Sequence, residues 1–156
     1  MRSPKLIKSV ATGACREDEQ DDCLVRAVSN VAGKSYDEVH NVCAMHGRKD
    51  RKGSSLDVVR SVLNVYKFKG LVIGKTITSK YLAWLCPEFD YDPSVSKTLN
   101  SVTKELKAGK YLLLIKGHAT ALINGGIVDT FDNSAGKHVY AIFWLEDQFE
   151  SINRSQ

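Results

Sequence analysis

Cys23 and His118 are the two residues of this 156-residue sequence whose positions best suit nucleophilic chemistry. Cys23 lies at the start of a predicted helix, because the apolar residues after it recur at helical spacing as far as Gly33. The positive end of a helix favours a thiolate, which is the reactive form of cysteine. The adjacent carboxylates of Asp21 and Asp22 oppose a thiolate, so the sequence predicts a cysteine that needs a nearby imidazolium.

His118 opens an apolar run, residues 119–123, that predicts a strand. A histidine at the edge of such a strand is either a hydrogen-bonded core residue or a general base held on a rigid element. Cys23 is in the same way either a small core residue or a nucleophile. The remaining histidines are weaker candidates for a base: His40, His46 and His138.

The dipeptide Asn124-Gly125 predicts a two-residue hairpin turn, and this turn determines which acid lies near His118. In that register Asp129 shares a face of the sheet with His118 and is its diagonal neighbour. A three-residue turn would reverse the parity and place Asp132 opposite His118 instead. The Asn-Gly signal favours the first register, so Asp129 is the residue predicted to orient the imidazole.

The elements that would position these residues are helices in the first two thirds of the chain and strands in the last third. Helices are predicted near residues 23–32, 35–46, 54–66, 79–85 and 97–108, and a short strand near 71–73. Further strands are predicted near 111–115, 118–123, 127–131 and 138–144. The chain is therefore expected to be one α+β domain over 1–156, with N-terminal helices packed on a C-terminal antiparallel β-sheet and residues 1–20 irregular.

Composition argues against several other classes of protein. The formal charge is +4, from 22 Lys+Arg and 18 Asp+Glu, and the basic cluster 48–52 has no interleaved aromatic residues, so nucleic-acid binding is a minor alternative. The four cysteines, Cys15, Cys23, Cys43 and Cys86, include no CxxC pair, so no metal site or cofactor is predicted. The longest apolar run, 111–115, is too short to span a bilayer, and the N-terminus lacks a signal-peptide core. A cytoplasmic protein without a membrane segment is expected.

The order of cysteine, histidine and acid resembles that of papain-like cysteine peptidases, including the small bacteriocin-processing (C39-like) branch. Residues 22–28, 33–39 and 117–132 look more closely like a group of small bacteriophage-type proteins. The resemblance implies a papain-like fold. It also implies a catalytic triad in which Cys23 is the nucleophile, His118 the base and Asp129 the orienting residue.

One position departs from that pattern. Papain-like enzymes carry a glutamine shortly before the cysteine, which binds the oxyanion of the reaction intermediate. Glu17 occupies this position here, and the nearest glutamine is Gln20, which would have to serve in a loop of different shape. The backbone N–H of Cys23 is expected to supply the other donor.

Two functions follow from the resemblance. The first is a cysteine-dependent hydrolase that acts on an amide or isopeptide bond of a protein or peptide, as a peptidase, deamidase or acyl transferase. The second is a catalytically silent papain-like binding module, such as a bacteriophage protein that binds or inhibits a host protein in the host cytoplasm. The departure at the oxyanion position favours the second function.

Overall fold

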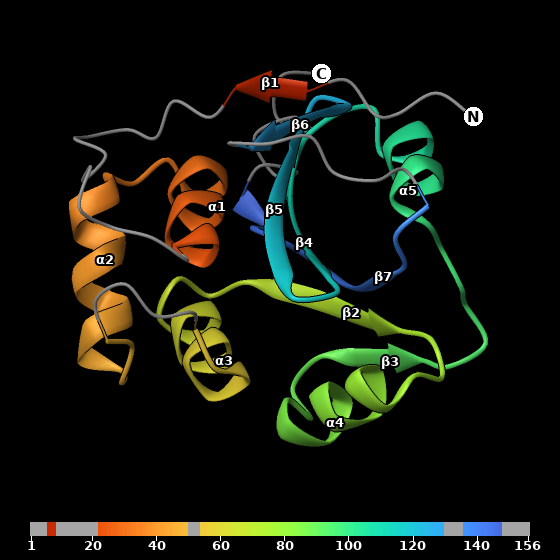
Figure 1. Ribbon diagram of the computed structural model, residues 1–156, viewed down its shortest axis with the longest axis horizontal. Coiled ribbons are helices and arrows are strands. Elements are labelled where there is room, and N and C mark those ends of the chain that lie inside the picture. The colour runs from red at the N-terminus through yellow and green to blue at the C-terminus, as the bar shows by residue number, and fades with distance from the viewer. Residues whose placement is uncertain (1–5, 9–21, 50–53, 130–135, 148–156) are drawn as a thin grey trace.

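The computed structural model describes residues 22–49, 54–129 and 136–147, and the backbone of residues 6–8 (Figure 1). These ranges contain five helices: α1 (Cys23–Ala32), α2 (Tyr36–Met45), α3 (Leu56–Val65), α4 (Ile77–Leu85) and α5 (Leu99–Glu105). They also contain seven strands: β1 (Leu6–Lys8), β2 (Lys69–Ile73), β3 (Asp90–Asp92), β4 (Lys110–Ile115), β5 (His118–Ile123), β6 (Gly126–Asp129) and β7 (Val139–Trp144).

The strands form one mixed sheet in the order β1-β6-β5-β4-β7-β2-β3. Neighbouring strands among the central five are antiparallel, whereas β1 joins β6 and β3 joins β2 in parallel. The predicted α+β class is confirmed. The C-terminal strands pair antiparallel as predicted, but the whole sheet is mixed, because parallel edge strands extend it on both sides. The two parallel edge strands have three residues each, which is too short for a recognisable alternating pattern. For the same reason β1 was not predicted within residues 1–20.

The helices begin where the sequence offers capping residues. Four helices start after a Ser or Thr whose hydroxyl accepts a hydrogen bond from the backbone N–H three residues later: Ser35, Ser55, Thr76 and Thr98. The helix α1 differs, because Asp22 occupies the N-cap position and its side chain makes no capping hydrogen bond. Gly33 ends α1 in the left-handed conformation, with φ of 66°.

Alternate residues of the central strands contribute to two separate hydrophobic cores. The larger core contains buried side chains of α1, α2, α3 and α4 together with one face of β2, β4, β5 and β7. The smaller core contains α5 and the other face, so that Leu112 and Leu114 belong to the first and Leu113 and Ile115 to the second. In Figure 1, α1 and α2 lie to one side of β4 and β5, and α5 lies to the other.

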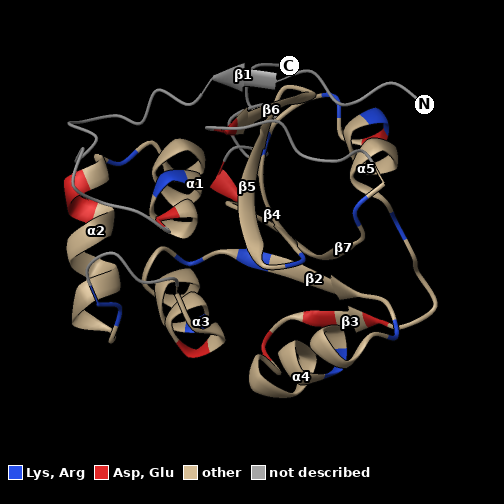
Figure 2. Cartoon of the chain, in the orientation of Figure 1, with Lys and Arg blue, Asp and Glu red and all other residues tan. Residues whose placement is uncertain are grey.

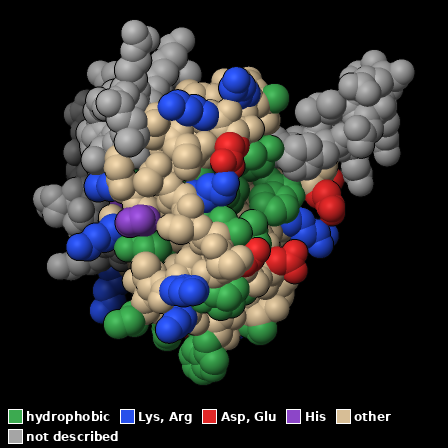
Figure 3. Space-filling view, turned by 90° about the vertical axis from the view of Figure 1, so that its right-hand side faces the viewer, with side chains coloured by type: hydrophobic (Ala, Val, Ile, Leu, Met, Phe, Trp, Pro, Cys, Tyr) green, Lys and Arg blue, Asp and Glu red, His purple; other side chains and the backbone are tan. Residues whose placement is uncertain are grey.

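The face of the sheet that carries the smaller core has an apolar hollow of about 410 Å³. It is lined by Leu71, Ile73, Ile142 and Trp144 and bordered by the ion pair of Lys97 and Glu105, whose Nζ and Oε1 atoms are 2.7 Å apart. Hydrophobic side chains interspersed with charged ones are visible on this face in Figure 3. In the described part of the chain, each helix is too short or too polar to cross a membrane.

Candidate active site

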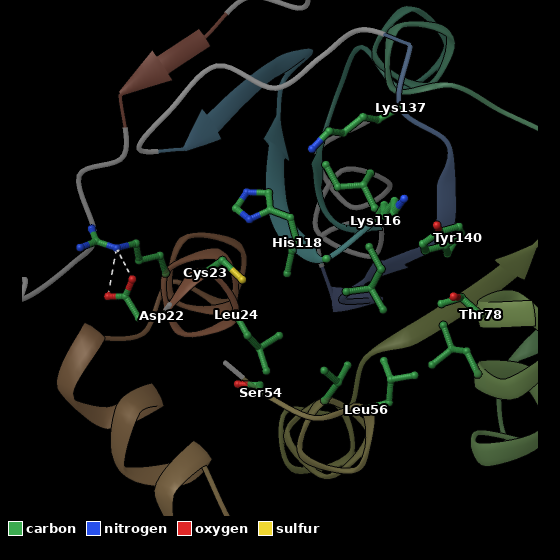
Figure 4. Close-up of a pocket in the computed structure, with 17 residues that line it drawn as sticks. Asp22, Cys23, Leu24, Ser54, Leu56, Thr78, Lys116, His118, Lys137 and Tyr140 are labelled. Carbon is green, nitrogen blue, oxygen red and sulfur yellow. Dashed lines mark hydrogen bonds and ion pairs between the residues drawn. The ribbon is translucent and has the colours of Figure 1, made fainter. Parts of the chain in front are cut away.

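A cleft of about 760 Å³ contains both Cys23 and His118 in its lining. It is formed by the start of α1, by α3 and α4, by the turn between β4 and β5, and by the residues around the start of β7. In Figure 4, Cys23 projects from α1 and His118 from β5 on neighbouring sides of this cleft. Cys23 is partly exposed, whereas Cys43 and Cys86 are buried, so Cys23 is the described cysteine that a molecule in the cleft can reach.

The hairpin of β5 and β6 has the register that the Asn-Gly dipeptide predicts. Ile123 pairs with Gly126, and Asn124 and Gly125 form the turn with positive φ angles of 49° and 83°. A turn of two residues leaves Asp129 on the same face of the sheet as His118. The predicted register is therefore confirmed.

The carboxylate of Asp129 contacts two side chains of β5. His118 Nε2 lies 2.6 Å from Asp129 Oδ2, and the Thr120 hydroxyl donates a hydrogen bond to the same oxygen at 2.5 Å. Asp129 is 7% exposed, so both contacts lie away from water. They hold the imidazole in one orientation on a rigid pair of strands. The alternative acid, Asp132, lies outside the described residues, as does Gln20.

Cys23 and Asp129 both act on the protonation of His118. Burial alone would lower the pKa of this histidine, but hydrogen bonds and charge interactions with Asp129 and Cys23 outweigh burial and raise the pKa to about 9. Since Nε2 is bonded to Asp129, Nδ1 is the ring nitrogen that remains for the sulfur of Cys23. The structure thus places the three predicted residues close together: the thiol of Cys23, the imidazole of His118 and the carboxylate of Asp129.

Asp22 directly precedes Cys23, but its carboxylate is engaged in the protein interior. Arg26 Nε donates hydrogen bonds to both carboxylate oxygens at 3.0 and 3.1 Å (dashed lines in Figure 4), and the Tyr36 hydroxyl donates to Oδ2 at 2.6 Å. Arg26 therefore balances the negative charge that Asp22 places next to Cys23. Asp21 lies outside the described residues.

Several residues around the site were not identified from the sequence. The pair of Asp22 and Arg26 has the i, i+4 spacing of a helical ion pair, which could have revealed it. Lys116 and Lys137 line the cleft, but they lie far apart in the sequence and no local pattern connects them. Of the basic cluster 48–52, Arg48 is 5% exposed and thus not available to a phosphate backbone, and residues 50–52 are outside the described part.

Comparisons of the chain with protein-family models, with curated proteins and with solved structures found no match. Among the described residues, no group of three or more His, Cys, Asp or Glu side chains is placed to hold a metal ion. The functional argument therefore depends on the geometry of Cys23, His118 and Asp129. A partly exposed thiol beside an imidazole that is oriented by a carboxylate can carry out nucleophilic attack and proton transfer.

We expect His118 to titrate with a pKa of about 9 in the folded protein, well above the ordinary histidine value of 6.5. The titration can be followed by NMR through the Cε1 proton of the ring, assigned with a His118→Gln variant. In Cys23→Ala the pKa should fall, because the contribution of the sulfur is lost, but it should stay raised because Asp129 remains. A pKa near 6.5 in the wild type would contradict the arrangement.

The same shift has a consequence for stability, which is clearest in Cys23→Ala because the thiol no longer titrates. A histidine whose pKa is raised by folding stabilises the folded state in its protonated form. This stabilisation is complete below the unfolded value of 6.5 and is lost as the pH rises through the folded pKa. Urea unfolding of Cys23→Ala across this pH range, compared with Cys23→Ala/His118→Gln, measures the effect.

Proposed function

We propose that this protein is a papain-like, cysteine-dependent hydrolase that cleaves an amide or isopeptide bond in a protein or peptide. The observation that carries the proposal is the contact of Asp129 with His118 Nε2, which leaves the other ring nitrogen for Cys23 at the start of α1. This is the order of contacts that a Cys–His–Asp triad needs. The papain-like fold is part of the proposal, supported by a thiol on a helix and by the base and acid on neighbouring antiparallel strands.

In the first half of the proposed reaction, the Cys23 thiolate, paired with protonated His118, attacks the carbonyl carbon of the substrate. The C–N bond then breaks, His118 gives the proton to the departing amine, and a thioester joins the acyl group to Cys23. Asp129 keeps the imidazole in position and stabilises its protonated form throughout.

In the second half, a water molecule gives a proton to His118 and its oxygen attacks the thioester carbon. The C–S bond breaks, the acid is released, and the sulfur leaves as the thiolate that begins the next cycle. The oxyanion formed in each half needs hydrogen-bond donors. Cys23 is the first residue of α1, and a backbone N–H at this position has no partner within the helix, so we assign it one such role.

We expect Cys23→Ala to abolish hydrolysis, with a fall in rate of at least about a thousand-fold, because the nucleophile is removed. The assay incubates the protein with a complex peptide mixture and identifies newly formed termini by mass spectrometry. Cys86→Ala is the matched control, since Cys86 is a buried cysteine outside the cleft. Equal cleavage by wild type and Cys23→Ala would refute the proposal.

The alternative is a papain-like binding module without turnover, such as a bacteriophage protein that binds a host protein. It predicts no new termini with the wild type and a stable complex with a host protein that survives Cys23→Ser. These two results together would replace the hydrolase by the binding module. A complex that Cys23→Ser traps and the wild type releases as cleaved product would instead support the hydrolase.

A further inference from the structure

The cleft around Cys23 has two chemically different walls. One is apolar and comes from the helices, with Leu24 of α1, Leu56 of α3 and Leu82 of α4. The other is cationic, with Lys116 in the turn between β4 and β5 and Lys137 shortly before β7. In Figure 4 the leucines of α1 and α3 lie below Cys23 and His118, and the two lysines lie above and beside them.

The sheet brings the two lysines together although they are distant in the sequence. The strands β4 and β7 are antiparallel neighbours, and Ile115 at the end of β4 pairs with Val139 at the start of β7. Lys116 directly follows β4 and Lys137 lies two residues before β7, so both lie at the same end of the sheet. Figure 2 shows basic residues at this end of the sheet and acidic residues along β3.

The positive charge of this wall is not balanced within the described part of the chain. Asp22 is the sole acidic residue among the described residues that line the cleft, and Arg26 already pairs with it. The ammonium groups of Lys116 and Lys137 make no hydrogen bond or ion pair with described residues. Protonated His118 is balanced by Asp129, so the excess positive charge of the cleft comes from the two lysines, and this charge attracts anions.

The apolar side of the cleft also contains a buried polar atom. Ser54 Oγ is buried and has no hydrogen-bond partner among the described residues, and Ser54 lines the cleft. A buried hydroxyl without a partner is costly, so it is well suited to pair with a polar group of a bound molecule. The N–H and C=O groups of a peptide backbone provide such partners on both sides of an apolar side chain.

We infer that the cleft selects acidic peptides: substrates with a carboxylate group near the reacting carbonyl on the lysine side and a branched apolar side chain on the leucine side. This inference rests on the proposed function, because it names the substrate class of the same site. Two ammonium groups at the edge of a cleft raise the local concentration of anions and reject cations. Selection between a carboxylate and its neutral amide is therefore the property to measure.

Alkylation of Cys23 tests this selection without turnover. Iodoacetate and iodoacetamide both alkylate a thiol through their CH₂ carbon. Iodoacetate carries a negative carboxylate, and iodoacetamide carries a neutral amide in its place. In the Lys116→Glu/Lys137→Glu variant, we expect the rate of iodoacetate relative to iodoacetamide at Cys23 to fall about ten-fold, and less at high salt. Lys104→Glu/Lys107→Glu is the matched control, with the same change of charge at exposed lysines that do not line the cleft. Equal effects of the two double variants would overturn the inference.

Peptide cleavage provides a second, separate readout. The substrates are pairs of peptides that are identical except for a Glu or a Gln next to a leucine. The wild type should cleave the Glu peptide faster, and Lys116→Glu/Lys137→Glu should cleave the Gln peptide faster. Cleavage without this preference would overturn the substrate class and leave the hydrolase intact. Failure to cleave any peptide, with the alkylation preference present, would refute the hydrolase while supporting anion selection by the cleft.

Discussion

At neutral pH, His118→Gln should slow the alkylation of Cys23 by iodoacetamide by roughly a hundred-fold. Alkylation requires the thiolate, and the nearby His118 has a pKa of about 9, so it is an imidazolium at this pH and stabilises a negative sulfur. Glutamine is uncharged and removes this stabilisation. The rate at each cysteine can be measured by mass spectrometry of the digested protein after quenching at successive times.

The protein contains its own controls for this experiment. Burial raises the pKa of both Cys43 and Cys86 to about 11, so neither thiol should react in the folded protein. His46→Gln is the matched control for His118→Gln, because His46 is an exposed histidine outside the cleft. If Cys23 reacted like a thiol in an unfolded peptide, and equally in both histidine variants, the thiol–imidazole pair would not exist.

Asp22→Ala should lower the free energy of unfolding by about 3 kcal/mol. The substitution leaves the Tyr36 hydroxyl, whose residue is 0% exposed, without its 2.6 Å partner, and it leaves the guanidinium of Arg26 without its carboxylate. Removing one member of a buried charged network costs more than the network contributes, because the remaining groups lose hydrogen bonds that water cannot replace. Urea denaturation at neutral pH measures the change.

Two control variants test whether the loss of stability comes from the contacts of Asp22. Tyr36→Phe removes the hydroxyl alone and should cost about 1–2 kcal/mol, less than Asp22→Ala. Asp90→Ala removes an exposed aspartate of β3 and should change stability by less than about 0.5 kcal/mol. Similar stability of Asp22→Ala and Asp90→Ala would show that the contacts of Asp22 with Arg26 and Tyr36 contribute little to the fold.

The half of the candidate site that could be predicted from the sequence is the half that depends on local rules. Asn124-Gly125 determines the length of one turn, and strand alternation then determines that Asp129 and His118 share a face. The closeness of Cys23 to His118 depends on how α1 packs against the sheet, and hydrophobic periodicity does not predict this packing. It was expected only from the order of the residues along the chain.

The features that the sequence did not predict all depend on contacts between residues that lie far apart along the chain. Neither β1 nor β3 has enough residues to show a pattern, and each is ordered by the strand beside it. The partnership of Asp22 with Tyr36 requires α1 and α2 to pack together. The lysine wall of the cleft requires β4 and β7 to be neighbours in the sheet, although β5 and β6 separate them along the chain.

The unequal spacing of the three site residues along the chain has a consequence for folding. His118 and Asp129 are joined by one tight hairpin, whereas nearly a hundred residues separate Cys23 from His118. Contacts between residues close in sequence form faster than contacts that close long loops. A chain with the hairpin formed and α1 not yet docked therefore carries an ordinary, unactivated cysteine. The proposed thiol–imidazole pair can form only when α1 docks beside β5, so the enhanced reactivity of Cys23 should begin at this step of refolding.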